Sequence, residues 1–414
     1  MNQSAASLPV AQRIPVLDIV RGFALLGILI MNMPGFGTSF FAEADGSHLW
    51  PGRVDQWAEN LRDMLFSGKF NSMFSLLFGI GFTIQFTRME ERDPAHATAL
   101  YLRRLVVLGL IGLLHVCVFW SGDVLHIYAL LGLLLVFPLR HASRRTIVSL
   151  IVLCLAYPVV SGVLRLLVVT PDVTAMLVQR AKEFEASNNA AYGHGSFWDA
   201  TVEHVREFGY IYGNRWTLWG YAGFYVQMAL TMLLGLLVGR EGWVRRIPEL
   251  LPPIRRLTGW ALALGLVCGA AFTLVFEFNR TPGPSAIKML GGLCYWVSRP
   301  AMMIFYVLVI VQLAQRPAWQ ARFAPIAAAG RMPLTNYLMQ TLICTTLFNG
   351  WGFGLWGRVG PAAGLALAFV IYFAVQVPCS LWWLRRHERG PMEQLWSRLT
   401  YGRAPRAGVA VASS

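Results

Sequence analysis

Hydrophobic residues recur along this chain in ten long stretches, and short polar segments separate most of them. A helix that crosses a bilayer needs roughly 20 predominantly apolar residues, and the stretches come close to this length or exceed it. We therefore predict an all-α integral membrane protein with about ten transmembrane helices. The predicted spans are residues 14–35, 65–86, 102–120, 124–140, 145–169, 220–239, 257–278, 292–314, 332–349 and 361–384. The second is expected to break near Gly68, because Asp63 and Lys69 flank its start.

The basic residues outside these stretches predict the orientation. They are concentrated in every second connecting segment, which is typical of cytoplasmic loops. The prediction is a short cytoplasmic N-terminus (1–13), one polytopic membrane domain (14–384) and a basic cytoplasmic tail (385–414). The long segment at about 170–219 then lies in the periplasm.

A helix is also predicted inside this periplasmic segment, at residues 197–208. Trp198, Val202 and Val205 share one face of it, and Glu203 lies elsewhere on the helix. An amphipathic helix of this kind lies on the membrane surface or caps the bundle.

Composition supports a membrane protein of one domain. The chain is 56% hydrophobic and only 14% charged, whereas soluble domains are about 25% charged. The net charge of +14 would indicate nucleic acid in a soluble protein, but here the basic residues lie in membrane loops, so no nucleic-acid partner is predicted. The six cysteines show neither C-x-x-C nor Cys/His spacing, so neither a zinc site nor a disulfide framework is predicted.

The first span carries polar residues that are costly in a bilayer. Ionisable residues within spans face the bundle interior and are functional candidates. Arg21 and Asn32 are eleven residues apart, which places them on one helical face, and Asp18 lies one turn before Arg21. We predict that all three line a substrate site; an ion pair that only docks the helix, and a helix cap at Asn32, are the alternatives.

The stretch GLLHVCVFWSGDVLHIYALLG, residues 112–132, is the richest in candidate chemistry. His115 ends one span, the Ser121-Gly122 turn brings Asp123 to the start of the next, and His126 lies one turn further. A histidine beside an aspartate can act as an oriented general base. We predict His115 and Asp123 as catalytic residues; the alternatives are a core histidine and a helix N-cap.

Later spans add fewer polar groups. Lys69, Arg299, Asn336 and Gln340 are predicted to bind substrate. Snorkelling is the alternative for Lys69, and interhelical amide hydrogen bonds are the alternative for Asn336 and Gln340. No metal-ligand cluster and no tightly bound cofactor are predicted.

Six motifs in order resemble one family over nearly the whole chain. They are LDIVRGFALLGILIMN, GKFNSMFSLLFGIGF, HVCVFWSGDVLHIYALLG, MLLGLLVGR, GRMPLTNYLMQTLI and RGPMEQLWSRLTYG. Together they resemble the YeiB-like family of bacterial inner-membrane proteins, domain of unknown function four-one-eight. That resemblance implies a multi-pass protein of the bacterial inner membrane and does not imply a reaction.

The opening LD-x-x-RG-x-A is also similar to that of transmembrane acyltransferases, which move an acyl group from a cytoplasmic donor to an acceptor on the far side. In one such type a histidine follows the arginine at the spacing that here ends on Asn32. Asparagine cannot be a general base, so His115 is our first choice of base and His48 our second.

Three functions follow from these observations. The leading hypothesis is transfer of an acyl group to an envelope acceptor such as a glycan or lipid, with acyl-CoA as co-substrate. The alternatives are a small-solute transporter and a non-catalytic membrane scaffold. Internal repeats would favour a transporter, and none is found in the sequence. The sequence alone does not decide whether the protein is an enzyme, and it predicts no oligomeric state.

Overall fold

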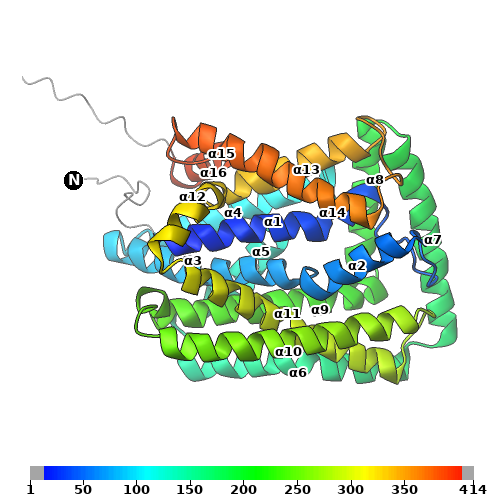
Figure 1. Ribbon diagram of the computed structural model, residues 1–414, viewed down its shortest axis with the longest axis horizontal. Coiled ribbons are helices and arrows are strands. Elements are labelled where there is room, and N and C mark those ends of the chain that lie inside the picture. Colours follow the sequence, from blue (N-terminus) through cyan, green and yellow to red (C-terminus); the bar gives the residue numbers. More distant parts are fainter. Residues whose placement is uncertain (1–13, 403–414) are drawn as a thin grey trace, which may run out of the picture.

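The computed structural model describes residues 14–402, and this part of the chain is built from helices without a strand (Figure 1). Residues 1–13 and 403–414, which include the predicted N-terminal segment and the end of the predicted tail, lie outside the described residues. The helices are α1 (Pro15–Gly37), α2 (Arg53–Leu65), α3 (Lys69–Arg92), α4 (Ala97–Val118), α5 (Leu125–Leu131), α6 (Arg144–Val168), α7 (Pro171–Gly193), α8 (Phe197–Gly213), α9 (Arg215–Arg240), α10 (Leu251–Phe278), α11 (Ala286–Leu313), α12 (Pro317–Gly330), α13 (Pro333–Phe348), α14 (Pro361–Val370), α15 (Val377–Leu384) and α16 (Pro391–Tyr401). Short π-helical turns extend α5 (Gly132–Val136) and join α14 to α15 (Ile371–Gln376).

Eight helical runs in the described part are long and apolar enough to cross a membrane. They are α1, the run Arg53–Arg92, α4, α6, α9, α10, α11 and the run Pro361–Leu384. The prediction of an all-α membrane protein is thereby confirmed. The other two predicted spans, 124–140 and 332–349, contain the shorter helices α5 and α13, so the count of ten stays a prediction.

The break predicted near Gly68 is present. The α2 helix ends at Leu65, and α3 begins at Lys69 after Gly68, whose φ of +73° is readily adopted by glycine. This break sets the N-terminus of α3 inside the bundle, beside the site described below.

The α3 and α9 helices approach each other through glycine. A Cβ atom on Gly79 would lie 2.1 Å from the carbonyl oxygen of Met232, and a Cβ on Gly235 would lie 2.1 Å from that of Leu76. Small residues allow membrane helices to come this close. Their contact fixes α3, and with it the N-terminus of α3, against the bundle.

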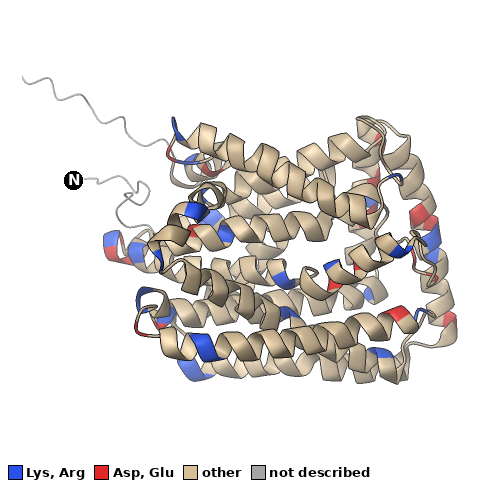
Figure 2. Ribbon diagram, viewed as in Figure 1, with Lys and Arg blue, Asp and Glu red and all other residues tan. Residues whose placement is uncertain are grey.

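The two ends of the bundle differ. The α7 and α8 helices cover one end, which we call the α7–α8 end, whereas the start of α1 and the helix α16 lie at the opposite end (Figure 1). Charged residues gather at these two ends, and few lie between them (Figure 2). Both described ends of the chain are therefore on the same side of the bundle.

The helix predicted for residues 197–208 is confirmed as part of α8, but its buried face is polar. Glu203 and Glu207 are buried, whereas Trp198 and Val202 are 71% and 67% exposed. The α8 helix therefore turns its acidic face to the protein and its apolar face outward.

Within the predicted tail, 385–414, the helix α16 is docked on the bundle. Glu393 accepts hydrogen bonds from the backbone of Leu334 and Thr335 at the start of α13. The guanidinium of Arg104 stacks on the ring of Trp396 at 3.6 Å.

Candidate functional site

A partly open cavity of about 1000 Å³ lies at the α7–α8 end of the bundle. Residues of α6, α8, α9 and α11 form much of its wall. Asn32, Asp123 and Arg299 line it, so three of the residues predicted from distant parts of the sequence do converge on one site. His126, which the sequence places one turn after Asp123, lines it as well.

Asp123 connects two histidines. One carboxylate oxygen lies 2.8 Å from Nδ1 of His115, and the other lies 2.7 Å from Nδ1 of His126. The carboxylate also accepts from the backbone N–H of His126 at 3.1 Å, so it both caps α5 and binds the imidazoles. Asp123 is fully buried at its side chain, which makes these donors its stabilising partners.

The second ring nitrogen of His126, Nε2, points toward tyrosine hydroxyls. Its Nε2 lies 2.6 Å from the hydroxyl of Tyr212, and the hydroxyl of Tyr225 donates to that of Tyr212 at 2.9 Å. With Nδ1–H donated to Asp123, Nε2 carries the lone pair, which is the tautomer a general base requires. Tyr212 and Tyr225 line the same cavity.

His115 occupies a different place. It is 3% exposed, it is not among the residues that line the cavity, and its Nε2 lies 3.0 Å from the hydroxyl of Thr341. Both ring nitrogens therefore have protein partners. His126 therefore faces the cavity, whereas His115 holds Asp123 from behind, and this position makes His126 the better candidate for a base. The three-residue spacing from Asp123 was the sequence signal that pointed to His126.

The predicted pair Asp18 and Arg21 lies apart from this cavity. Arg21 donates to Asp18 at 2.7 Å near the start of α1, and neither residue lines the cavity. Asn32 is eleven residues further along α1, about 16 Å at 1.5 Å per residue. A shared helical face therefore did not imply a shared site.

Asn336 and Gln340 join helices. Asn336 donates to the carbonyl oxygen of Ala329, and Gln340 donates to that of Leu25 at 3.0 Å and to the side-chain oxygen of Gln376 at 2.9 Å. Both amides are buried and absent from the cavity lining. The structure favours the interhelical alternative over substrate binding.

Lys69 is fully buried, which argues against snorkelling. It begins α3, directly after Gly68, and Arg299 of α11 lies against that glycine. The two predicted cations are therefore neighbours in the structure.

Buried polar residues of α7 and α8 were missed by the sequence analysis. Glu207 lines the cavity and accepts a hydrogen bond from Asn188 at 2.6 Å. Burial raises the pKa of Glu207 from 4.5 to about 7, because the charged form loses its hydration. To identify this residue, one would have to know which face of α8 is buried, and the sequence does not indicate this.

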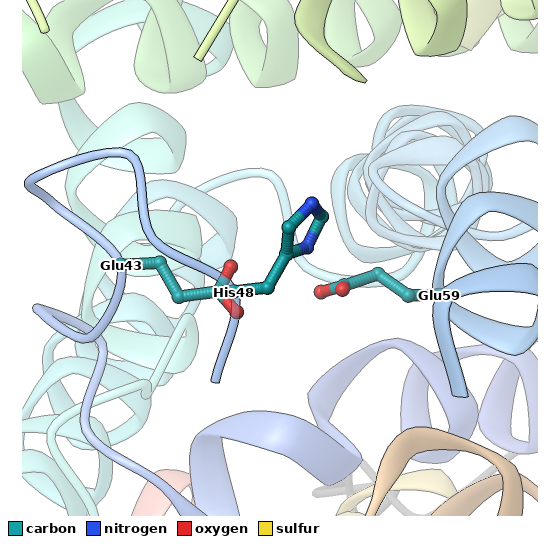
Figure 3. A group of neighbouring side chains, drawn as sticks. All are labelled: Glu43, His48 and Glu59. Atoms are coloured by element: carbon teal, nitrogen blue, oxygen red, sulfur yellow. The ribbon is translucent and has the colours of Figure 1, made fainter. Parts of the chain in front are cut away.

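The sequence predicts no metal-ligand cluster, yet the structure brings Glu43, His48 and Glu59 together, with one side-chain ligand atom of each within 4.8 Å of the others (Figure 3). Arginines already neutralise both carboxylates: Arg280 lies 3.6 Å from Glu43, and Arg62 lies 3.3 Å from Glu59. We interpret this group as an ion-pair network that ties the loop after α1 to α2 and α10. His48 is not among the residues that line the large cavity, so its selection as second base is not supported by position.

Comparison with known proteins identifies the family. A family model described as "Protein of unknown function (DUF418)" matches residues 238–403. The chain is 31% identical over 409 residues to the uncharacterized protein YeiB of Escherichia coli strain K12, covering 94% of this chain and 96% of that protein. The chain belongs to the DUF418 family.

Two further relatives come from Bacillus species. The uncharacterized protein YxaH of Bacillus subtilis strain 168 is 29% identical, with 94% of each chain covered. An uncharacterized 39.9 kDa protein of Bacillus acidopullulyticus is 27% identical, with 95% of each chain covered. No solved structure matches the chain. The YeiB-like resemblance is confirmed, whereas the acyltransferase likeness depends on the sequence motif alone and stays a prediction.

Proposed function

We propose that this DUF418 protein is an enzyme of the bacterial inner membrane that transfers an acyl group to a hydroxyl of an envelope glycan or lipid. The observation that carries the proposal is the pair His126 and Asp123 on the wall of a large cavity. An imidazole held by a carboxylate through Nδ1 is the arrangement that activates a hydroxyl in acyl transfer.

The reaction would proceed through proton transfer at His126. The acceptor hydroxyl replaces Tyr212 at Nε2 and gives its proton to the imidazole as its oxygen attacks the acyl carbonyl carbon. Asp123 stabilises the imidazolium that forms. The imidazolium then returns the proton to the leaving group as the bond between the acyl carbon and that group breaks.

Asn32 completes this set. It lines the same cavity, and its side-chain amide can donate to the oxyanion that develops on the acyl carbonyl. This role replaces the base that the related acyltransferase spacing would place at this position. Acyl-CoA remains the proposed source of the acyl group on the basis of that sequence likeness; with the cavity on the predicted periplasmic side, the acyl group has to cross the membrane before it reaches His126.

A histidine substitution tests the proposal. In membranes that contain equal amounts of protein, His126→Gln and Asp123→Asn should each lower transfer of a labelled acyl group to envelope material by about 10²- to 10⁴-fold. His96→Gln is the matched control, because His96 is exposed and pairs with Asp93 in a loop. Undiminished transfer by His126→Gln would contradict the mechanism.

The transporter alternative needs a pathway to both sides of the membrane. The polar pair at the opposite end, Asp18 and Arg21, is not part of the cavity lining, and this favours a one-sided site. Solute uptake into proteoliposomes with the solute chemically unchanged would instead support transport.

A further inference from the structure

We propose that Arg299, backed by Lys69, forms a subsite of the large cavity that binds a phosphate group of the substrate. This inference names a substrate class for the proposed enzyme. It rests on the proposed function only for the acyl transfer that would follow binding. It is argued from the burial, partners and surroundings of the two cations.

Arg299 is a buried charge without a protein anion. Its residue is 5% exposed, and its Nε is buried without a hydrogen-bond partner. Its guanidinium makes no ion pair or hydrogen bond with a residue between 14 and 402 and instead stacks near Tyr295, at 4.9 Å, and Phe224, at 5.7 Å. A buried unpaired charge is strongly unfavourable, so this position calls for a bound anion.

The backbone of Gly68 makes room for that guanidinium. A Cβ atom on Gly68 would lie 2.1 Å from Nε of Arg299. The positive φ of Gly68 likewise disfavours a side chain at this position. Arg299 is therefore held at the break between α2 and α3, where it reaches the cavity wall.

Lys69 places a second buried basic group at the same position. Its ammonium donates to the carbonyl oxygen of Asp63 at 2.6 Å and lies 5.4 Å from the Tyr295 ring that Arg299 also approaches. The carboxylate of Asp63 is held by Arg62 through two nitrogens at 2.8 and 2.9 Å. Among the described residues no carboxylate forms an ion pair with Lys69.

The start of α3 strengthens the same subsite. Lys69 is the first residue of that helix, and the amides of a helix N-terminus attract anions. Asn71, in the first turn, lines the cavity. Arg299 and Asn71 therefore line the cavity, and Lys69 at the start of α3 is buried beside Arg299.

This charge count favours phosphate over a simple carboxylate. A carboxylate supplies a single negative charge, whereas a phosphomonoester carries between one and two near neutral pH and so compensates Arg299 while also favouring the protonated form of its neighbour Lys69. The planar guanidinium fork also matches phosphate oxygens in pairs. Aromatic residues such as Trp216, Tyr221 and Trp296 line the rest of the cavity and would contact the apolar or sugar part of the same molecule.

Lipid headgroups and soluble phosphate esters share this chemistry, and a binding experiment separates them. The full-length protein in neutral detergent is titrated with dihexanoyl phosphatidic acid, dihexanoylglycerol, coenzyme A and inorganic phosphate. We expect phosphatidic acid or coenzyme A to bind and dihexanoylglycerol, which lacks the phosphate, to bind at least tenfold more weakly. Tighter binding of phosphatidic acid assigns the subsite to a lipid; tighter binding of coenzyme A or inorganic phosphate assigns it to a soluble ester.

Three variants test the residues. Arg299→Gln should weaken binding of the phosphate ligand by about 10- to 100-fold, the range of a charge-assisted hydrogen bond. Gly68→Ala should weaken it without any change of charge, because the new methyl group displaces Arg299. Arg180→Gln removes an exposed arginine of α7 and should leave binding unchanged. Thermal unfolding of each variant establishes that it is folded.

The inference fails if none of the three phosphate ligands binds, or if Arg299→Gln binds the phosphate ligand as tightly as the unaltered protein does. That result leaves the proposed reaction open to its own test at His126. Conversely, binding that depends on Arg299 in a protein without transfer activity would support the phosphate subsite and contradict the proposed reaction.

Discussion

Glu207 has the most unusual titration of the residues outside the membrane spans that line the cavity. It is 1% exposed and lies near Glu203, which also disfavours its charged form, whereas the amide of Asn188 donates to its carboxylate. Burial outweighs the hydrogen bonds and raises its pKa to about 7. The protein should therefore keep this carboxyl protonated in mildly acidic solution, where an unfolded chain would already have ionised it.

This raised pKa predicts how stability depends on pH. The carboxyl of the unfolded chain ionises near pH 4.5, whereas that of the folded protein ionises near 7. The folded state thus loses stability as the pH rises from about 4.5 to about 7, by roughly 3 kcal/mol in total, and the loss is constant above that range. Glu207→Gln should remove this dependence and raise the melting temperature at pH 8 relative to the unaltered protein, measured by thermal unfolding in detergent.

Glu185→Gln is the matched control for Glu207→Gln. It removes a carboxyl from α7 that is not among the residues that line the cavity. This variant should keep the pH dependence of the unaltered protein. An equal slope in Glu207→Gln and the unaltered protein would show that the carboxyl does not titrate as described.

At the scale of helices, the contact between α3 and α9 depends on missing side chains. A Cβ atom on Gly79 would collide with the backbone of α9, and a Cβ atom on Gly235 would collide with the backbone of α3. Backbone atoms cannot move aside as a flexible side chain can, so even one methyl group would force the helices apart. This separation would shift α3 and the two cations near its start.

Gly235→Ala tests this contact. Alanine stabilises an isolated helix by about 1 kcal/mol relative to glycine, but here the added methyl would collide with the backbone at Leu76, and overpacking typically costs 1–3 kcal/mol. We expect a lower melting temperature than that of the unaltered protein. Gly259→Ala in α10 has no atom within 4 Å of the new methyl and should be neutral or stabilising. Equal behaviour of the two variants would contradict the packing account.

The positions of the helices could be predicted from the sequence more fully than the side of each helix that is buried. Apolar runs located the spans, and the break at Gly68 followed from the polar residues around it. In α8, however, the spacing of Trp198 and Val202 identified an apolar face without showing that the opposite face packs on the bundle. That outcome depends on partners in α7, such as Asn188, which are distant in sequence.

At the scale of the molecule, the sequence could not predict which polar residues from different helices line the same cavity. Helical periodicity grouped Arg21 with Asn32 because both lie on one face of α1, yet only Asn32 reaches the cavity. Asn32, His126 and Arg299 line one cavity although they belong to three different helices, α1, α5 and α11. Which helices meet is decided by packing across the whole bundle, and residue spacing within one helix carries no information about it.

The orientation of the whole bundle determines which molecules reach this cavity. The arginine-rich loops predict that the α7–α8 end faces the periplasm, which would expose the cavity to envelope acceptors. Single cysteines in a background without the six native ones test this. Ala186→Cys in α7 should react with a membrane-impermeant maleimide in intact spheroplasts, because that residue is exposed.

Ala318→Cys at the start of α12 is the counterpart on the opposite end, and it is exposed as well. It should react only after the membrane is permeabilised. The reverse pattern would place the cavity on the cytoplasmic side. Acyl-CoA would then reach His126 directly, while envelope acceptors would be excluded, so the proposed acceptor would be wrong although the chemistry of His126 and Asp123 would be unaffected.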